Sequence, residues 1–306
     1  MFKEIKREIF YTKEIFRYGH GLTGLLRYVK NRLFGRFFIK QLEKYNCQPE
    51  NDLEIHLLCQ KKDIQMLVWS LKSFLHFSEL CPKIIVHDDG SLTKELADFL
   101  KGKFGNLEVI FKSEADEIIN NAPGLSRKLI EYREGGHKLI LKLIDVCLLS
   151  RAPKIIVLDT DVLFFKRPKE IIDFVKNSYP CEALVSMSHG PWELRLNGKY
   201  LSEHHILDSR ANYINTGIMV LNKNKITADM LLEFFDNADG PINSYLIEMT
   251  GGAFLLNHTK FCFLPIERYH IKGGLMSETV AKHFTNPRRH EFYAYGIDEV
   301  RKRMLA

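Results

Sequence analysis

A continuous apolar strand that ends in two carboxylates is the feature that most constrains the fold of this chain. The stretch from Lys154 to Phe165 reads KIIVLDTDVLFF, and residues 155–158 are apolar without interruption. An unbroken run of this kind is typical of a strand of a parallel sheet that is covered on both faces. Asp159 and Asp161 follow where the strand ends. We therefore expect a layered α/β domain with two acidic side chains at the carboxyl edge of its sheet.

Strand and helix patterns alternate on both sides of this stretch. Strands are expected at 53–59, 83–87, 107–111, 182–187 and 213–222, and helices at 63–78, 92–101, 136–149, 226–237 and 242–256. Such alternation predicts a mostly parallel sheet with helices on both faces. The segment 189–212 has only weak periodicity, so we expect a long loop near a site there.

Composition and cysteine placement favour a globular protein of a reducing compartment. The 306 residues are 45% hydrophobic and 27% charged, which excludes disordered and collagen-like classes. Six cysteines are scattered without a C-x-x-C pair, and several stand in apolar segments. We interpret them as reduced core residues rather than a disulfide framework or a zinc site, which favours a cytoplasmic location. No apolar run reaches the ~18 residues of a membrane-spanning helix, and no signal-peptide pattern opens the chain.

The basic excess of the chain lies entirely in residues 1–50. This segment holds 11 Lys and Arg against 5 Glu, whereas the remaining residues carry 33 basic and 33 acidic groups. Its aromatic and aliphatic residues recur among the basic ones at roughly helical spacing. We interpret residues 1–50 as a basic amphipathic helical arm that precedes a main domain at 51–306.

Two interpretations of the arm stay open. It lies on an anionic membrane surface through residues 1–45, which would make the protein peripheral at the inner face of a membrane, or it packs on the main domain with its basic residues in solvent. Nucleic acid is not an expected partner, because the chain carries no known nucleic-acid motif and its main domain is neutral.

A second acidic pair, Asp88 and Asp89, follows the strand at 83–87 in the run HDDGS. Its glycine permits a sharp turn, and its serine can cap the next helix. Turn chemistry alone can explain this run, just as a solvated strand end can explain Asp159 and Asp161. Two acidic pairs at two strand ends nevertheless favour a nucleotide pocket, because carboxylates there can hold Mg²⁺ or Mn²⁺ and can accept hydrogen bonds from a ribose or a base.

The order IIVHDDGS, IIVLDTDVLFF and INTGIMVLN resembles glycosyltransferases of the GT-A fold over about residues 53–290. DDGS alone is similar to the large inverting family that includes cellulose and hyaluronan synthases. LDTDVLFF with NTGIMVLN looks more like the retaining family of glycogenin and the bacterial lipopolysaccharide galactosyltransferases. The resemblance implies a Rossmann-like GT-A domain whose Asp-X-Asp motif holds a divalent cation on the diphosphate of a sugar nucleotide. It implies a UDP-sugar as donor and a glycan or lipid-linked acceptor.

The same resemblance implies a metal site made of Asp159, Asp161 and His283, the last of which stands in VAKHFTN. The expected ion is Mn²⁺ or Mg²⁺, and an imidazole beside two carboxylates suits Mn²⁺ better. A lone histidine outside such a context is usually structural.

Further roles follow residue by residue from the resemblance. Lys142 would contact the sugar-nucleotide donor. Asp88 or Asp89 would contact its nucleoside, and Asp159 and Asp161 would act at its diphosphate. Asn215 would lie beside the sugar, and Glu248 would orient the sugar or act as a base. Each of these side chains also has a structural interpretation: a lysine that extends along an amphipathic helix, an amide at a strand end, a solvated glutamate.

The chain departs from the retaining family at two places. The glycine and lysine that usually follow the metal-binding histidine are replaced by the run HFTNPRRH, so Arg288 or Arg289 is the candidate to take the phosphate role. The acidic residue and glutamine that usually lie near the sugar correspond to Glu248 and Met249. The stereochemical outcome of a transfer reaction is therefore open.

Two other functions compete with a glycosyltransferase. A hydrophobic strand with Asp-X-Asp is also the first motif of haloacid dehalogenase-type phosphohydrolases, but Leu163 stands where that motif has Thr or Val, and the motif usually opens its domain. The second alternative is a degenerate sugar-nucleotide-binding module without activity. The intact set of Asp159, Asp161 and His283 argues against decay.

Overall fold

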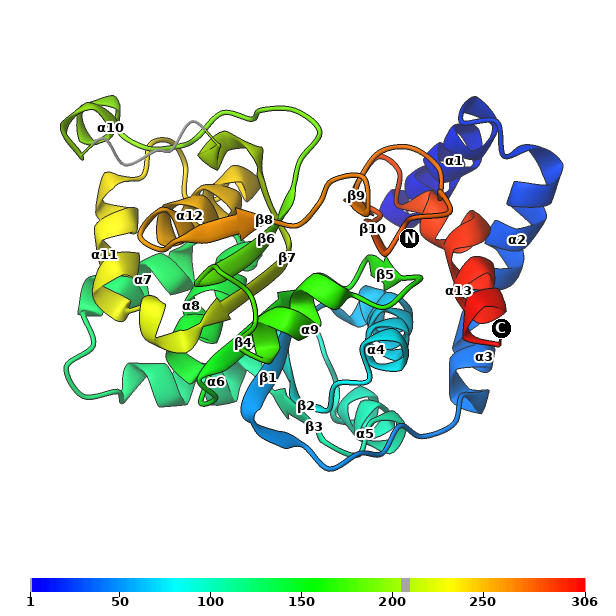
Figure 1. Ribbon diagram of the computed structural model, residues 1–306, viewed down its shortest axis with the longest axis horizontal. Coiled ribbons are helices and arrows are strands. Elements are labelled where there is room, and N and C mark those ends of the chain that lie inside the picture. The colour runs from blue at the N-terminus through cyan, green and yellow to red at the C-terminus, as the bar shows by residue number, and fades with distance from the viewer. Residues whose placement is uncertain (1, 205–209, 306) are drawn as a thin grey trace.

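A computed structural model describes residues 2–204 and 210–305 of the chain, and the expected segment 189–212 therefore falls partly outside the described residues. Figure 1 shows a central sheet with helices on both of its faces and a group of helices from both chain ends at one side. None of the described helices has the length and apolar character that crossing a bilayer requires.

The central sheet has seven strands in the order β3-β2-β1-β4-β7-β6-β8. Their bounds are β1 Glu50–Cys59, β2 Pro82–Asp88, β3 Leu107–Ile110, β4 Lys154–Leu158, β6 Ala183–Met187, β7 Ile214–Asn222 and β8 Phe261–Phe263. Strands β3, β2, β1 and β4 pair in parallel, as do β6 and β8, whereas β7 is antiparallel to β4 and β6. The predicted strands and the mostly parallel sheet are confirmed.

Strand β4 shows why its sequence is apolar without alternation. Ile155 and Val157 belong to a hydrophobic core on one face of the sheet, which also contains residues of the helices there. Ile156 and Leu158 belong to the core on the opposite face. Because both faces of the strand are covered, no position in it faces solvent.

Helices cover the two faces of the sheet (Figure 1). They are α4 Ile64–Ser78, α5 Lys94–Lys103, α6 Lys112–Asn120, α7 Arg127–Gly135, α8 Leu141–Leu149, α9 Lys169–Val175, α11 Ala228–Asn237 and α12 Tyr245–Asn257. Helix α10 (Gly198–His204) lies away from the sheet at the upper left of Figure 1, and α13 (Ile297–Met304) lies among the arm helices at the right. The helices that the sequence predicted correspond to α4, α5, α8, α11 and α12. Helices α6, α7, α9 and α13 were not predicted, and α10 lies in the segment that we expected to be a loop.

The second half of the apolar run KIIVLDTDVLFF belongs to a different sheet. Strands β5 (Val162–Phe164), β10 (Ala281–His283) and β9 (Tyr269–His270) form a three-stranded sheet in the order β5-β10-β9. Strand β10 is antiparallel to β5, with His283 opposite Val162. This pairing brings a late segment of the chain to the end of β4.

The N-terminal arm consists of α1 (Phe2–Arg17), α2 (Gly21–Leu33) and α3 (Gly35–Gln41). Its inner side packs on the main domain, because Tyr11, Ile15, Tyr28 and Ile39 are part of the main hydrophobic core. Polar contacts add to this packing: Asn31 Nδ2 donates to the Tyr293 carbonyl at 2.9 Å. The arm therefore packs on the rest of the chain through this inner side.

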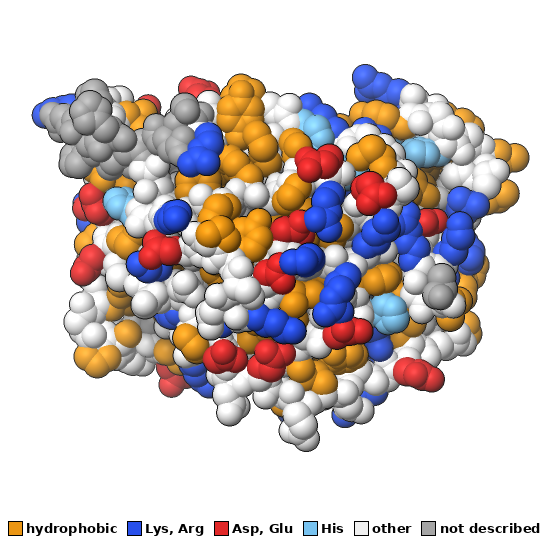
Figure 2. All heavy atoms as spheres, viewed as in Figure 1, with side chains coloured by type: hydrophobic (Ala, Val, Ile, Leu, Met, Phe, Trp, Pro, Cys, Tyr) orange, Lys and Arg blue, Asp and Glu red, His pale blue; other side chains and the backbone are white. Residues whose placement is uncertain are grey.

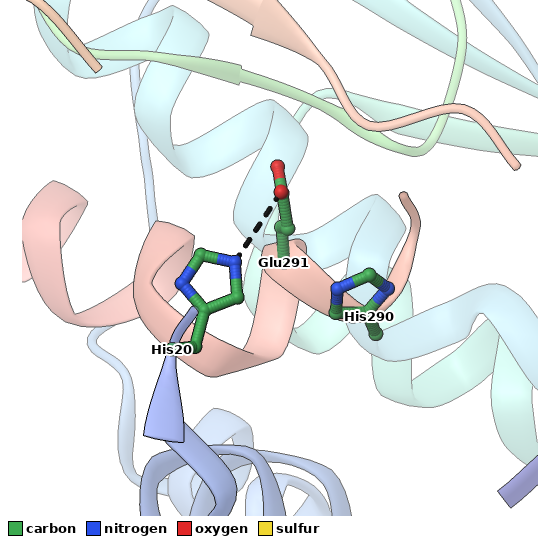
Figure 3. Close-up of side chains that lie close together, drawn as sticks. All are labelled: His20, His290 and Glu291. Atoms are coloured by element: carbon green, nitrogen blue, oxygen red, sulfur yellow. Dashed lines mark hydrogen bonds and ion pairs between the residues drawn. The ribbon is translucent and has the colours of Figure 1, made fainter. Parts of the chain in front are cut away.

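A buried glutamate ties the arm to the C-terminal segment (Figure 3). Glu291 is 0% exposed, and its carboxylate lies 3.3 Å from His20 Nε2 of the arm. Lys282 Nζ, itself fully buried, lies 3.1 Å from the same carboxylate, and the Tyr295 hydroxyl donates to it at 2.8 Å. Burial would raise the pKa of Glu291, but His20, Lys282 and Arg288 hold that pKa below its ordinary value.

The prediction that all six cysteines are reduced is wrong for four of them. Cys47 pairs with Cys81 and Cys181 pairs with Cys262, each pair with its Cα atoms 6.0 Å apart. The partners lie 34 and 81 residues apart, so only the pairing of β1 with β2 and of β6 with β8 makes them neighbours. Cys59 and Cys147 are free and buried, as expected. The cysteines therefore give no support to the inference of a reducing compartment for this protein.

Replacement of Glu291 by Gln should destabilise the fold by about 3 kcal/mol, because it leaves the buried Lys282 ammonium without its counter-charge. Since the folded pKa of Glu291 is depressed, its contribution is complete above the ordinary carboxyl pKa and is lost as pH falls below it. Urea unfolding at several pH values measures both effects. Glu278→Gln is the matched control, because its side chain is 72% exposed and should cost at most about 0.5 kcal/mol.

Candidate metal centre

Three side chains that could hold a metal ion meet at the end of β4. Asp159 and Asp161 follow the strand directly, and β10 places His283 against them. His283 Nε2 lies 3.0 Å from Asp161 Oδ1 and 3.5 Å from Asp159 Oδ2. Asp161 and His283 are nearly buried, whereas the Asp159 side chain is 26% exposed. The structure thus brings together the three residues that the resemblance implied, with one of them open to solvent.

The ring of His283 is fixed by the Asn215–Gly217 segment of β7. His283 Nδ1 lies 2.9 Å from Asn215 Oδ1, and the same oxygen accepts the Gly217 N–H at 3.1 Å. A Cβ atom on Gly217 would lie 2.2 Å from His283 Nδ1, so only glycine leaves room for the ring. The Asn-Thr-Gly sequence therefore has a local physical reason: its amide orients the imidazole and its glycine makes space for it.

The orientation of His283 leaves its second ring nitrogen facing two carboxylates. Since the Gly217 N–H identifies the Asn215 atom as an acceptor, His283 Nδ1 must donate to it. His283 Nε2 then faces the two carboxylates, a position at which either a proton or a metal ion can lie between the nitrogen and the oxygens. Two carboxylate oxygens and an imidazole nitrogen within 4.8 Å of one another form a donor set that fits Mn²⁺. The residues present therefore fit a divalent cation.

A buried lysine organises the other side of Asp159. Lys142 of α8 is 2% exposed, and its Nζ lies 2.8 Å from Asp159 Oδ1 and 2.8 Å from Glu248 Oε1 of α12. Burial would lower the pKa of Lys142, but the two carboxylates raise it above its ordinary value, so the ammonium stays charged. Burial raises the pKa of Glu248, and Lys142 opposes that rise. Thr216 donates to Glu248 Oε2 at 3.1 Å and completes the cluster.

Arg289 holds the oxygen of Asp161 that does not face His283. Its Nε donates to Asp161 Oδ2 at 2.9 Å and its Nη2 to the same oxygen at 2.5 Å. Burial would raise the pKa of Asp161, but Arg289 and His283 hold it below its ordinary value. Of the two arginines that the sequence offered for a phosphate role, Arg289 lies at this site, whereas Arg288 pairs with Glu291. Apart from His283, the site holds the three carboxylates of Asp159, Asp161 and Glu248 and the two cations of Lys142 and Arg289.

The second acidic pair lies at the end of β2 and serves the turn that follows. Asp88 Oδ1 accepts the backbone N–H groups of Ser91 at 2.9 Å and Leu92 at 2.8 Å. Asp89 is 2.9 Å from Lys138 Nζ through its other carboxylate oxygen and also accepts from Ser91. Both carboxylates are buried. Their turn chemistry is thus visible in the structure, while their contact with a nucleoside stays a prediction.

Among the described residues, one other group could offer three ligand atoms to a metal: His20, His290 and Glu291. Figure 3 shows the two imidazoles on opposite sides of the carboxylate. Glu291 already contacts the Lys282 ammonium and the Arg288 guanidinium. Two resident cations disfavour a third, so this cluster is better explained as the anchor of the arm.

Sequence reasoning missed the contribution of the arm to this region. The Tyr11 hydroxyl donates to Asn286 Oδ1 at 3.1 Å, in the loop between His283 and Arg289. Nothing local in the sequence around Tyr11 marks this contact, because it joins residues 275 positions apart. Thr216 could have been found, since it stands inside the Asn-Thr-Gly motif.

Comparisons with solved structures identify the fold. No protein-family model and no curated protein sequence matches the chain. The structure is similar to xyloside xylosyltransferase 1 from mouse in its apo form, with a TM-score of 0.51 and 11% identity over 78% of this chain and 99% of that one. It is also similar to the apo WbbM bifunctional glycosyltransferase, with a TM-score of 0.51 and 12% identity over 85% of this chain and 51% of that one. The predicted glycosyltransferase-type α/β fold is therefore confirmed.

Substitution of Gly217 by Ala should displace the His283 ring and destabilise the protein by about 1–3 kcal/mol, because the new methyl group overlaps the imidazole. Urea unfolding gives the energy, and a crystal structure of the variant shows the ring. Gly102→Ala in α5 is the control, since its Cβ would meet nothing within 4 Å and should stabilise the helix by about 0.5–1 kcal/mol. Equal stability of the Gly217 variant and the parent would contradict the packing argument.

Proposed function

We propose that this protein is a metal-dependent glycosyltransferase that moves a sugar from a UDP-sugar donor to a glycan or lipid-linked acceptor. The observation that carries the proposal is the His283 imidazole, whose Nε2 faces Asp161 and Asp159 at the carboxyl end of β4. That edge of an open α/β sheet is where ligands bind. The fold shared with glycosyltransferases supports the same assignment and does not favour a haloacid dehalogenase-type phosphohydrolase.

The residues of the site have different proposed roles in sugar transfer. Asp159, Asp161 and His283 would hold the cation, Mn²⁺ or Mg²⁺, whose charge stabilises a departing nucleoside diphosphate. Arg289 stands beside Asp161, where its guanidinium can bind a phosphate oxygen. Asp88 and Asp89, at the end of β2, are proposed to face the nucleoside. Because the leaving group carries the negative charge, this electrostatic stabilisation is the main catalytic effect that we expect.

Lys142, Glu248 and Asn215 act next to the metal ligands. Lys142 bridges Asp159 Oδ1 and Glu248, and the other oxygen of Asp159 is turned toward His283. We propose that the Lys142 ammonium contacts the donor and that Glu248 and Asn215 line the sugar side of the site. Glu248 is buried beside that ammonium, so it is better suited to orienting groups than to taking a proton from an acceptor.

Calorimetric titration of UDP, GDP and CMP, each with and without Mn²⁺, tests the proposed donor class. We expect tight binding of UDP that requires the metal. Absence of nucleotide binding under every condition would contradict the proposal and would favour a degenerate module.

Asp161→Asn should abolish metal-dependent UDP binding, because it removes a ligand charge while keeping the size of the side chain. We expect at least about a hundredfold loss of affinity, in line with the cost of removing a charged partner from a buried site. Asp98→Asn on the exposed face of α5 is the matched control and should bind UDP as the parent does. Unchanged affinity in a folded Asp161→Asn variant would exclude this residue from the site.

We further propose that the outer side of the arm lies on an anionic membrane. Its exposed large hydrophobic residues are Ile5, Ile9, Phe10, Phe16, Leu22, Leu26, Val29, Leu33, Phe34 and Phe37. In α2 they recur at intervals of three and four residues and form one stripe. Figure 2 shows hydrophobic and basic side chains together on the right of the molecule, where the arm lies. An apolar surface of this extent usually marks an interaction site.

The exposed charges of the arm indicate which kind of membrane surface it would bind. Between residues 5 and 42, every charged side chain in the exposed class is Lys or Arg: Lys6, Lys13, Arg17, Arg27, Lys30, Arg36 and Lys40. The acidic residues of this range are Glu8, which is half-buried and lies 3.4 Å from Arg7, and Glu14, which is buried. Exposed apolar residues among basic ones are the signature of a helix that binds in the plane of an anionic bilayer.

Leu26→Ser with Leu33→Ser should weaken binding to vesicles that contain anionic phospholipid by about tenfold or more, because two leucines that are 62% and 67% exposed would no longer enter the bilayer. Cosedimentation measures the binding. The control pair is Ile118→Ser with Met276→Ser, both 50% exposed and outside the arm. Point variants are preferable to deletion of the arm, which would uncover the main core. Equal binding by both pairs would contradict membrane contact through this stripe.

A further inference from the structure

A cavity lies between the arm and the candidate metal centre. Its polar lining comes from Arg7 and Tyr11 of α1, Arg32 of α2, Lys62 and Asp63 before α4, and Arg289. The cavity has a volume of about 90 Å³ and opens to solvent. The cavity thus has one wall from the arm and one wall that carries the arginine bound to Asp161.

The four cations around this cavity exceed the acidic groups beside it by one. Glu8 lies 3.4 Å from both Arg7 Nη2 and Arg32 Nη2, and its other oxygen accepts from Tyr28. Asp63 is the acidic residue in the lining itself. Four cations therefore surround a space next to which stand Glu8, Asp63 and the Asp161 partner of Arg289. If Asp161 binds a metal ion, its attraction for Arg289 weakens. The net positive charge around the cavity then increases.

At this cavity, two hydrogen bonds fix the arm against the segment that leads to the candidate metal centre. The Tyr11 hydroxyl donates to Asn286 Oδ1, and Arg32 Nη1 donates to the Tyr293 hydroxyl at 3.0 Å. Both partners belong to the C-terminal segment that carries Arg289. Arg7 and Arg32 therefore line the cavity and do not form a solvent-exposed cationic face.

We propose that the arm supplies half of a phosphate-binding pocket, in which Arg7, Arg32 and Lys62 act together with Arg289. The ligand is a phosphate group of a transfer substrate, either the diphosphate of the donor or the head group of a lipid acceptor, and this identification of the carrier rests on the proposed function. Guanidinium groups from two sides match the oxygens of a phosphate. The outer side of the arm would then contact a membrane while its inner side lines the pocket.

The pocket is tested by Arg7→Gln with Lys62→Gln, two partly or fully exposed side chains whose replacement should leave the fold intact. The matched control is Lys101→Gln with Arg127→Gln, which makes the same change of charge at two exposed residues outside both the cavity and the arm. Calorimetry uses inorganic pyrophosphate, UDP with Mn²⁺, and a short-chain phosphatidic acid below its micelle concentration. Unfolding curves establish that each variant is folded. Lys62→Gln alone, against Lys94→Gln, replaces the pair if the double variant does not fold.

We expect the Arg7 and Lys62 pair to weaken pyrophosphate binding by about tenfold or more relative to the control pair. The same loss with UDP identifies the donor as the carrier, and the same loss with phosphatidic acid identifies a lipid acceptor. Equal binding of all three ligands by both pairs would overturn the proposal. Failure of the parent protein to bind UDP with Mn²⁺ would instead contradict the proposed function, and the pyrophosphate comparison would still decide whether the pocket exists.

Discussion

The pairing of β10 with β5 is the constraint on which the rest of the site depends. It places His283 opposite Val162 and so carries an imidazole across 122 residues to Asp161. Neither strand is longer than three residues, so backbone hydrogen bonds alone would hold this small sheet weakly. Additional contacts come from Asn215, which fixes the ring, and from the Phe284 N–H, which donates to the Asp161 carbonyl at 2.9 Å.

Charge compensation explains why so many ionisable groups tolerate burial in one place. Lys142 lies between Asp159 and Glu248, and Arg289 binds Asp161. Each pair offsets the desolvation of its members, which would otherwise cost several kcal/mol per ion. The remaining negative charge faces the Nε2 atom of His283. A site that is balanced except at one point, and open to solvent at Asp159, is suited to accept a cation together with its ligand.

The sequence predicted those parts of the structure that depend on local patterns. The apolar run of β4 was found, because burial on two faces leaves a direct mark on composition, and Asp159 and Asp161 were placed correctly at a strand end. Helices α4, α5, α8, α11 and α12 were found from their patterns, whereas α6, α7, α9 and α13 were not. The disulfides Cys47–Cys81 and Cys181–Cys262 were missed, because spacing along the chain does not reveal which strands become neighbours. His283 was found only through a family resemblance. The contact of Tyr11 with Asn286 had no sequence signal at all.

The most direct test of this account is pulsed electron–nuclear double resonance on Mn²⁺ added to the protein with ¹⁵N-labelled histidine. The account predicts the coupling of a directly coordinated imidazole nitrogen, and it predicts that His283→Gln loses this coupling. The same coupling in the variant, or a spectrum of fully hydrated Mn²⁺ in the parent protein at metal concentrations that saturate UDP binding, would contradict a metal centre made of Asp159, Asp161 and His283.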